Sequence, residues 1–202
     1  GIDITAPSIS NNMLSMAENN TSIGTVTASE SVSFQEIAGY DSAKLSISSS
    51  GVFTIDTAPN YENPQSYYSN NQYGMYVRMI DANGNYADGY VQVTVTDVNE
   101  YATLTLPTLS TSPLKGVPVT ITVTPGGDTP VPAGIITYLA AGKRIPGCYK
   151  KTYSGSGNST CTWKPPSMGY EEITVTFTPT NTSYYAVTTK KSFWILKRST
   201  NR

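Results

Sequence analysis

The sequence contains no histidine, and this absence removes several kinds of chemistry. Hydrolases that depend on a Ser-His-Asp or Cys-His arrangement are excluded, and so are zinc sites with an imidazole ligand. The two cysteines are too few for an all-cysteine zinc site. Glu171 and Glu172 are adjacent, so a strand would point them to opposite faces and they would not form an acid–base pair. We therefore expect that the chain is not an enzyme.

The chain also lacks long apolar runs and amphipathic helical patterns. No segment is apolar enough to cross a membrane and no signal peptide is visible, so we expect no membrane insertion. Apolar and polar residues alternate instead in short runs between Gly, Asn and Ser turns, which is typical of β-sandwiches. These runs cover residues 22–29, 43–48, 51–55, 72–80, 89–97, 102–106, 117–125, 133–142, 159–164, 171–179 and 190–196. The alternation predicts an all-β fold.

The same period of two predicts which side chains form the core. Three strands each place every second residue on one face, with threonine or glutamine filling most of the opposite face. The predicted core residues are Val91, Val93 and Val95, then Val119, Ile121 and Val123, then Ile173, Val175 and Phe177.

The two cysteines, Cys148 and Cys161, are thirteen residues apart in polar runs that flank a Gly/Ser-rich turn. A disulfide across this hairpin fits the spacing and would indicate an oxidising compartment. Closing so short a loop would stabilise the fold by about 3 kcal/mol in the entropy model. The alternative is two free thiols in a cytosolic protein.

Charge is distributed unevenly along the chain. Residues 1–100 carry two basic and eleven acidic residues, a net charge of −9, whereas residues 101–202 carry eleven basic and three acidic residues, a net charge of +8. This asymmetry favours head-to-tail attraction between copies, or a basic end that faces an anionic surface. The alternative is that the acids serve local ion sites and the lysines are simply solvated. The change of sign places a domain boundary near Glu100.

The first half resembles the cadherin-like repeats of bacterial surface proteins, over about residues 10–100. Three ordered segments carry the resemblance: AENNTSIGTVTAS at 17–29, GVFTIDTAPNYENP at 51–64 and VRMIDANGNYADGYVQVTVTDVNE at 77–100. In this family calcium binds at the junction between consecutive domains. Calcium prefers six to eight oxygen ligands, several of them carboxylate.

The resemblance implies a calcium site at the C-terminal end of this domain. The implied ligands are Glu18, Asn60, Glu62, Asp97, Asn99 and Glu100. Asn60 and Glu100 both stand where the family usually has aspartate. At the opposite end only Asp81 is present of the acids that the family uses, so no calcium site is expected there. The alternative is that all these acids are exposed turn and edge residues without a metal.

The second half resembles the bacterial Ig-like (Big-type) modules of surface adhesins, over about residues 102–197. The segments that carry this resemblance are residues 102–125, 133–143 and 177–189. Together the two resemblances imply tandem Greek-key β-sandwiches, cadherin-like over 1–100 and immunoglobulin-like over 101–202. In that topology Asp128 and Asn181 could donate oxygens at the junction, although ordinary Asx turns are the simpler interpretation.

The resemblances imply a non-enzymatic extracellular subunit with a structural or adhesive role, on a cell surface or in a surface filament. One alternative is a virion component of a bacterial virus, such as a capsid decoration or fibre protein. Another is a carbohydrate-binding module, which would need exposed aromatic planes. Trp163 and Trp194 lie in strand-like runs, so both are expected in the core. Most tyrosines are expected in the core or on a sheet face. The loop Asn63–Tyr73 is long and polar enough to be a recognition loop.

The expected partners follow from charge and compartment. Basic pairs interleaved with aromatics could bind single-stranded nucleic acid, but the disulfide argues for a location outside the cytosol, so we expect no nucleic acid. A second copy of the chain, an anionic surface polysaccharide or a protein lattice fits better. The sequence ends in KRSTNR without a sorting motif, so attachment is expected to be non-covalent unless the chain is a fragment.

Overall fold

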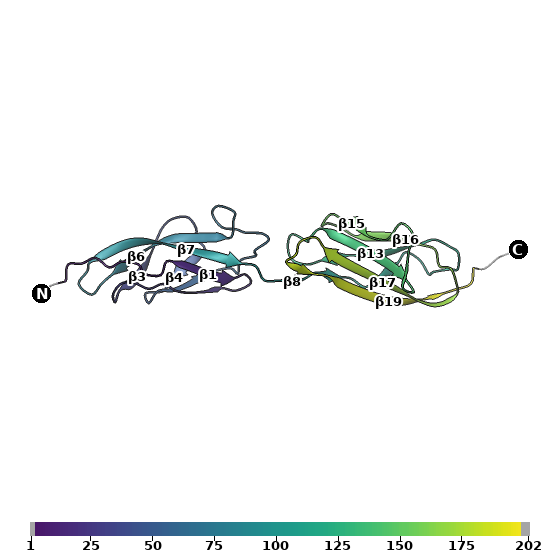
Figure 1. Ribbon diagram of the computed structural model, residues 1–202, viewed down its shortest axis with the longest axis horizontal. Helices are drawn as coiled ribbons and strands as arrows, with labels where there is room; N and C mark the ends of the chain where they lie inside the picture. Colours follow the sequence, from purple (N-terminus) through teal and green to yellow (C-terminus); the bar gives the residue numbers. More distant parts are fainter. Residues whose placement is uncertain (1–2, 199–202) are drawn as a thin grey trace. The chain divides into compact units, whose positions relative to one another are not determined.

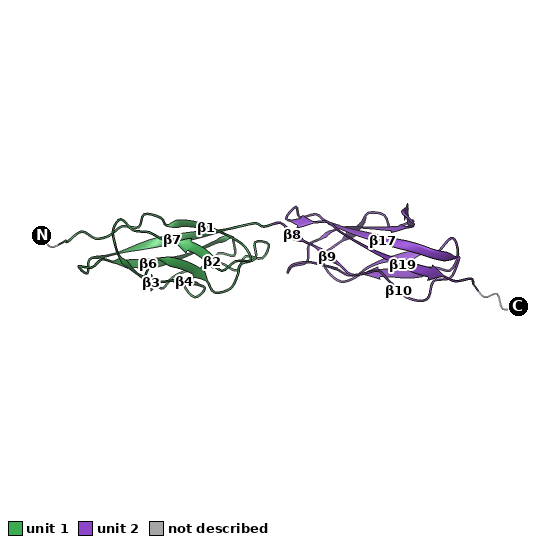
Figure 2. Cartoon of the chain, turned by 90° about the horizontal axis from the view of Figure 1, so that it is seen from below, with its two compact units in different colours: residues 1–98 green, residues 99–202 purple. Residues whose placement is uncertain are grey.

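The computed structural model describes residues 3–198, and every regular element in that range is a β-strand. Within this range no helix exists that has the length and apolar character needed to cross a membrane. The chain divides into two compact units, residues 1–98 (unit 1) and 99–202 (unit 2), coloured green and purple in Figure 2. The sequence placed the boundary near Glu100. The last four residues of the KRSTNR segment lie outside the described residues.

Unit 1 is a sandwich of two sheets (Figure 1). One sheet has the order β1-β7-β6-β3 and the other the order β2-β5-β4. The strands are β1 (Met13–Ala17), β2 (Ser22–Thr25), β3 (Ser33–Ile37), β4 (Leu45–Ile47), β5 (Val52–Ile55), β6 (Gln72–Ile80) and β7 (Tyr86–Thr96). β1 and β7 pair in parallel, whereas the other strand pairs of unit 1 are antiparallel. The ends of β1 and β7 therefore lie at the same edge of their sheet.

The core of unit 1 lies between its two sheets. Val91, Val93 and Val95 are fully buried, as the alternation predicted. The sequence did not predict β1 or β3, and the burial pattern gives the reason. Each of these strands buries a single residue, Met16 in β1 and Phe34 in β3. A strand with one fully buried side chain gives only a weak alternation to recognise.

Unit 2 is a second sandwich, built from a three-stranded and a five-stranded sheet. The smaller sheet has the order β10-β11-β16, and the larger the order β14-β13-β17-β19 with β15 also paired to β13. These strands are β10 (Thr108–Leu109), β11 (Val119–Val123), β13 (Gly134–Ala140), β14 (Lys143–Arg144), β15 (Lys151–Tyr153), β16 (Ser159–Trp163), β17 (Gly169–Pro179) and β19 (Val187–Ile195). Short pairs join β8 (Glu100–Tyr101) to β18 (Tyr184–Tyr185) and β9 (Thr103–Leu104) to β12 (Pro125–Gly126). The predicted all-β fold of two sandwiches is confirmed.

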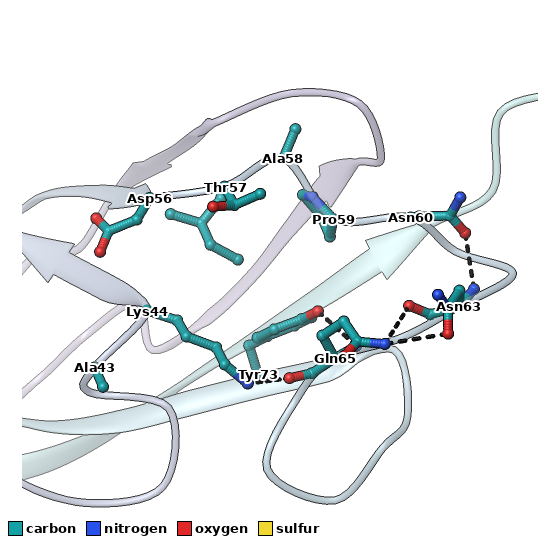
Figure 3. Close-up of a pocket in the computed structure, with 11 residues that line it drawn as sticks. Ala43, Lys44, Asp56, Thr57, Ala58, Pro59, Asn60, Asn63, Gln65 and Tyr73 are labelled. Carbon is teal, nitrogen blue, oxygen red and sulfur yellow. Dashed lines mark hydrogen bonds between the residues drawn. The ribbon is translucent and has the colours of Figure 1, made fainter. Parts of the chain in front are cut away.

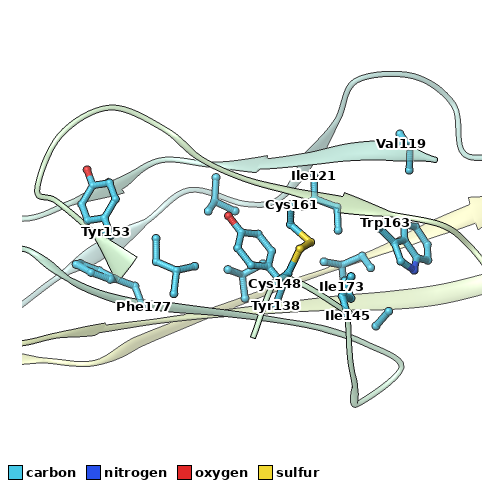
Figure 4. Packing of buried hydrophobic residues seen from close by; sticks show 14 of the residues in the cluster. Val119, Ile121, Tyr138, Ile145, Cys148, Tyr153, Cys161, Trp163, Ile173 and Phe177 are labelled. Atoms are coloured by element: carbon cyan, nitrogen blue, oxygen red, sulfur yellow. A yellow bond between two sulfur atoms is a disulfide. The ribbon is translucent and has the colours of Figure 1, made fainter. Parts of the chain in front are cut away.

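The core of unit 2 contains the disulfide between Cys148 and Cys161, whose Cα atoms are 5.6 Å apart (Figure 4). The bond is present, but the prediction that it closes a hairpin is wrong. Cys161 lies in β16 of the smaller sheet, whereas the carbonyl of Cys148 accepts a hydrogen bond from the amide of Tyr138 in β13 of the larger sheet (3.0 Å). The disulfide therefore joins the two sheets across the core. The Tyr138 hydroxyl makes a second link by donating to Ser159 Oγ in β16 (2.8 Å).

The two tryptophans have opposite environments. Trp163 is 3% exposed and lies in the same core as the disulfide, as predicted (Figure 4). Trp194 is 53% exposed, so the prediction that it is a core residue is wrong. It lies on the outer side of β19, where its ring contacts the ring of Tyr170 at 4.7 Å. The prediction failed because Trp194 is an aromatic residue at an outward-facing position of β19.

Candidate metal site

Three of the predicted calcium ligands come together at one end of unit 1. One carboxylate oxygen each from Glu18, Glu62 and Asp97 lies within 4.8 Å of the other two. Strand pairing explains this proximity, because Ala17 and Thr96 are partners at the ends of parallel strands β1 and β7. Glu18 and Asp97 are the next residue on each strand, so they leave the sheet side by side. Glu62 approaches from the loop between β5 and β6.

Glu18 has a role in this cluster that the sequence did not indicate. Its side chain is buried, and its Oε2 accepts the amide of Tyr61 (2.7 Å) while its Oε1 accepts the amide of Val98 (2.8 Å). These amides belong to the neighbours of Glu62 and Asp97. Glu18 therefore holds the loop and the strand end that carry the other two carboxylates, and it positions the site as well as contributing charge to it.

The donor set fits calcium. All ligand atoms are oxygens, and three carboxylates provide up to six of them, which suits a hard cation. Three close carboxylates repel one another unless a cation or a proton compensates their charge. Lys44 and Arg78, the basic residues of unit 1, contact other groups. Arg78 pairs with Asp88 through two hydrogen bonds, and Lys44 donates to the carbonyl of Gln65 and lies 3.9 Å from Asp41.

Asn60, Asn99 and Glu100 each have a defined contact within their own unit. Asn60 lies in the loop after β5, where its Oδ1 accepts the amide of Asn63 (2.7 Å). Asn99 and Glu100 belong to unit 2, in which Asn99 Nδ2 donates to the carbonyl of Thr182 (3.2 Å) and Glu100 is part of β8. Asn181 Oδ1 accepts the amide of Ser183 (3.0 Å), which is the Asx turn that the sequence favoured.

A second group of acids lies in unit 1 and consists of Asp3, Glu30 and Asp81. The sequence singled out only Asp81, because the other two are distant in the chain and match no motif. Asp81 accepts hydrogen bonds from the amides of Asn83 and Asn85 and from Asn85 Nδ2, at 2.7–2.8 Å. Burial raises the pKa of this carboxyl, but the hydrogen bonds together outweigh burial and lower the pKa. Asp81 therefore organises the turn at residues 82–85.

A cavity of about 440 Å³ in unit 1 is shown in Figure 3. Its wall is formed by residues 43–44, the segment 55–60, and the side chains of Asn63, Gln65 and Tyr73. The Tyr73 hydroxyl accepts the amide of Gln65 (3.2 Å), which closes one side of the cavity. The lining contains one acid, Asp56, and one base, Lys44, so it offers no pair of carboxylates for acid–base chemistry.

Five tyrosine side chains meet at the surface of unit 1, and we call this cluster the tyrosine surface. Its members are Tyr40, Tyr67, Tyr68, Tyr76 and Tyr90, with ring centroids 5.0–6.2 Å apart in six contacts. Tyr67 and Tyr68, each 62% exposed, belong to the loop that the sequence predicted to be a recognition loop. The sequence did not predict the cluster, because its members come from two loops and two strands.

No protein-family model matches the sequence, and no curated protein matches it. The fold is similar to solved cadherin extracellular domains. Protocadherin gamma B2 extracellular cadherin domains 3–6 align with a TM-score of 0.54 and 12% identity, covering 94% of this chain and 46% of that chain. PcdhgB3 domains EC1–4 align with a TM-score of 0.54 and 18% identity, covering 96% and 50%.

A third similar structure is a cis-dimer of protocadherin gamma B7 domains EC3–6, with a TM-score of 0.52, 14% identity and coverage of 95% and 48%. The chain thus spans about half the length of these proteins. At these identities the likeness concerns the fold. It agrees with the topology described above, in which the chain is all-β and forms two sandwiches.

Proposed function

We propose that this chain is a non-enzymatic, extracellular adhesion or structural subunit that binds calcium at Glu18, Glu62 and Asp97. The observation that carries the proposal is the convergence of these three carboxylates at the shared end of β1 and β7. The fold, which is similar to cadherin extracellular domains, and the disulfide, which needs an oxidising compartment, support it further. We also propose that unit 2 is a bacterial surface module, on the sequence resemblance stated above.

Calcium would act on the stability and order of unit 1. Glu62 and Asp97 would coordinate the ion with Glu18, and the ion would offset the repulsion among the three carboxylates. Because Glu18 also binds the amides of Tyr61 and Val98, the ion would restrain the loop after β5 and the last residues of unit 1 together. An extracellular location fits this role, because calcium sites of extracellular modules have dissociation constants of about 0.1–1 mM and are filled by millimolar calcium.

We further propose that copies of the chain associate head to tail. Unit 1 has two basic and ten acidic residues, a net charge of −8, and unit 2 has eleven basic and four acidic residues, a net charge of +7. Opposite charges attract unit 1 of one copy to unit 2 of another, whereas like units repel each other. A repeated contact of this kind is heterologous, so it extends into a filament unless it closes into a ring.

Thermal unfolding in calcium and in chelator tests the proposed ion site. Calcium at 100 times its dissociation constant would stabilise unit 1 by about 2.7 kcal/mol. In a domain of this size each kcal/mol raises Tm by about 4–8 °C. We expect millimolar calcium to raise the Tm of unit 1, and we expect Glu62→Ala and Asp97→Ala each to remove most of that rise.

Two further variants separate ligation from folding. Asp56→Ala removes an exposed acid of unit 1 that lies outside the cluster, so its calcium shift should equal that of the wild type. Glu18→Ala leaves the partly buried amides of Tyr61 and Val98 without their acceptor, so it should lower Tm even in chelator. A wild-type Tm that is the same in calcium and chelator would contradict the calcium site, whatever the variants do.

A further inference from the structure

A buried acid, Asp41, connects two of the segments that carry the tyrosine surface. Asp41 is buried; its Oδ1 accepts the amide of Tyr67 (2.7 Å), and its Oδ2 accepts the amide of Gly74 in β6 (3.1 Å). One carboxylate therefore connects the loop that carries Tyr67 and Tyr68 to the sheet. Gly74 leaves room for the Tyr90 ring, because a Cβ at this position would overlap the ring and its hydroxyl. The position of the Tyr90 ring therefore depends on Gly74, and the position of the Tyr67 backbone depends on Asp41.

The tyrosine surface has the electrostatic character of a cation receptor. Its ring faces carry the negative end of the aromatic quadrupole, which attracts ammonium and guanidinium groups. Unit 1 as a whole is acidic, and this net charge adds to the attraction. Burial, and after it the neighbouring Tyr40 and Asp41, raise the pKa of Tyr90, which shows that a negative charge on this ring is disfavoured.

Unit 2 presents a matching set of cations, which we call the basic ridge: Lys143, Arg144, Tyr149 and Lys150. The four side chains are exposed on β14 and the segment that follows it. The Arg144 guanidinium lies 3.9 Å from the centroid of the Tyr149 ring, and Lys150 Nζ lies 5.6 Å from it. Among the described residues, Arg144 and Lys150 have no carboxylate within ion-pair distance, whereas Lys190 is 3.2 Å from Glu172. Arg144 and Lys150 therefore keep their charges available for a partner.

We propose that the tyrosine surface of unit 1 binds the basic ridge of unit 2 of a second copy of this chain. Lysine and arginine side chains of the ridge would lie on the exposed tyrosine faces, and Tyr149 would add an aromatic contact at the centre. This inference rests on the head-to-tail association proposed above and assigns it two surfaces. Every copy carries one of each, so each contact leaves a free surface for the next copy.

Sedimentation velocity at low and high salt, about 50 and 500 mM, measures the association and its electrostatic part. The tyrosine variant carries Tyr67→Ser with Tyr68→Ser, and the ridge variant carries Arg144→Glu with Lys150→Glu. We expect wild-type association to weaken in high salt. Each variant alone should associate at least about tenfold more weakly than the wild type. An equimolar mixture should form a dimer and stop there, because each partner retains one intact surface.

Matched variants show whether the effect is local. Tyr101→Ser with Tyr185→Ser removes another exposed tyrosine pair, whose rings are 4.9 Å apart in unit 2. Lys115→Glu with Lys191→Glu makes the same change in net charge as the ridge variant at other exposed lysines. Both controls should associate like the wild type. Near-ultraviolet circular dichroism of every variant checks that it is folded.

The outcomes distinguish the two levels of the proposal. If the wild type associates and the tyrosine variant associates equally well, the tyrosine surface is not the contact, although head-to-tail association stands. If the wild type is a monomer at both salt concentrations, the head-to-tail association and the assigned contact surfaces are both wrong. The calcium site is tested separately by the Tm shift. Tyrosine-dependent binding to a neutral glycan array, with unchanged self-association, would assign the surface to a glycan and overturn this proposal.

Discussion

At the scale of single residues, buried carboxylates of unit 1 organise its loops. Glu18 accepts the amides of Tyr61 and Val98, and Asp41 accepts those of Tyr67 and Gly74. Both acids are buried, so each amide that they bind would lose a hydrogen bond if the carboxylate were removed. These two acids fix the loops that carry the candidate metal site and the tyrosine surface.

Replacing Asp41 tests this at the level of stability. Asp41→Ala leaves the amides of Tyr67 and Gly74 without an acceptor, and we expect unit 1 to lose about 2–4 kcal/mol of unfolding free energy. Urea unfolding measures the loss. Asp56→Ala, at an exposed acid of the same unit, should change stability by no more than about 0.5 kcal/mol. Equal effects of the two substitutions would show that the Asp41 hydrogen bonds contribute nothing.

At the scale of elements, alternation along a strand gives neighbouring residues different chemistry. In β17, Glu171 points toward the interior of unit 2 and is buried, whereas Glu172 points outward and lies 3.2 Å from Lys190 Nζ. Burial raises the pKa of Glu171, and the charge of Lys143 lowers it by less. The native state therefore holds the Glu171 proton more tightly than the unfolded state does, and ionised Glu171 destabilises the fold.

This pKa shift predicts a pH dependence with a definite sign. The stability that protonated Glu171 contributes is present below its ordinary pKa of 4.5 and is lost as pH rises through the raised native pKa. We expect Glu171→Gln to be more stable than the wild type at pH 7 and to lose this advantage below pH 4.5. Glu172→Gln should lower stability slightly, by about 0–1 kcal/mol, because it loses a surface ion pair. Chemical unfolding at pH values across this range measures these differences. A Glu171→Gln variant that is less stable than the wild type at pH 7 would contradict the raised pKa of Glu171.

At the scale of the whole molecule, the chain holds two separate cores with different means of stabilisation. The core of unit 1 contains no cysteine, and its candidate metal site lies at the end of one sheet. The core of unit 2 includes a disulfide that connects its two sheets. The net charges of the two units also have opposite signs.

This division predicts two unfolding transitions that respond to different agents. Reduction of the Cys148–Cys161 bond releases a loop of thirteen residues and should lower the stability of unit 2 by about 3 kcal/mol. We expect reductant to lower the Tm of one transition and calcium to raise the Tm of the other, in scanning calorimetry of the full chain. Cys148→Ala with Cys161→Ala should remove the response to reductant and keep the response to calcium. A single transition shifted by both agents would contradict this division.

The sequence was sufficient for the strands that alternate and for the pairing of the two cysteines. Strands such as β7, β11 and β17 bury every second residue, and a period of two is a local property that can be counted along the chain. Strands β1 and β3 escaped prediction because each buries one side chain and is held by pairing with a distant strand. The position of Trp194 was predicted wrongly because alternation along a strand separates two faces but does not say which face the other sheet covers.

Three features depended on the tertiary structure, because each joins segments that are far apart in the chain. The parallel pairing of β1 and β7 places Glu18 beside Asp97. Together with Glu62 they form a group in which one carboxylate oxygen of each residue lies within 4.8 Å of the others. The position of Cys148 against β13 makes the disulfide a link between sheets. The tyrosine surface exists only where two loops meet β6 and β7, so local sequence indicated the long polar loop at 63–73 but not the cluster. Local periodicity specifies what a strand buries, whereas pairing between distant strands decides which functional groups meet.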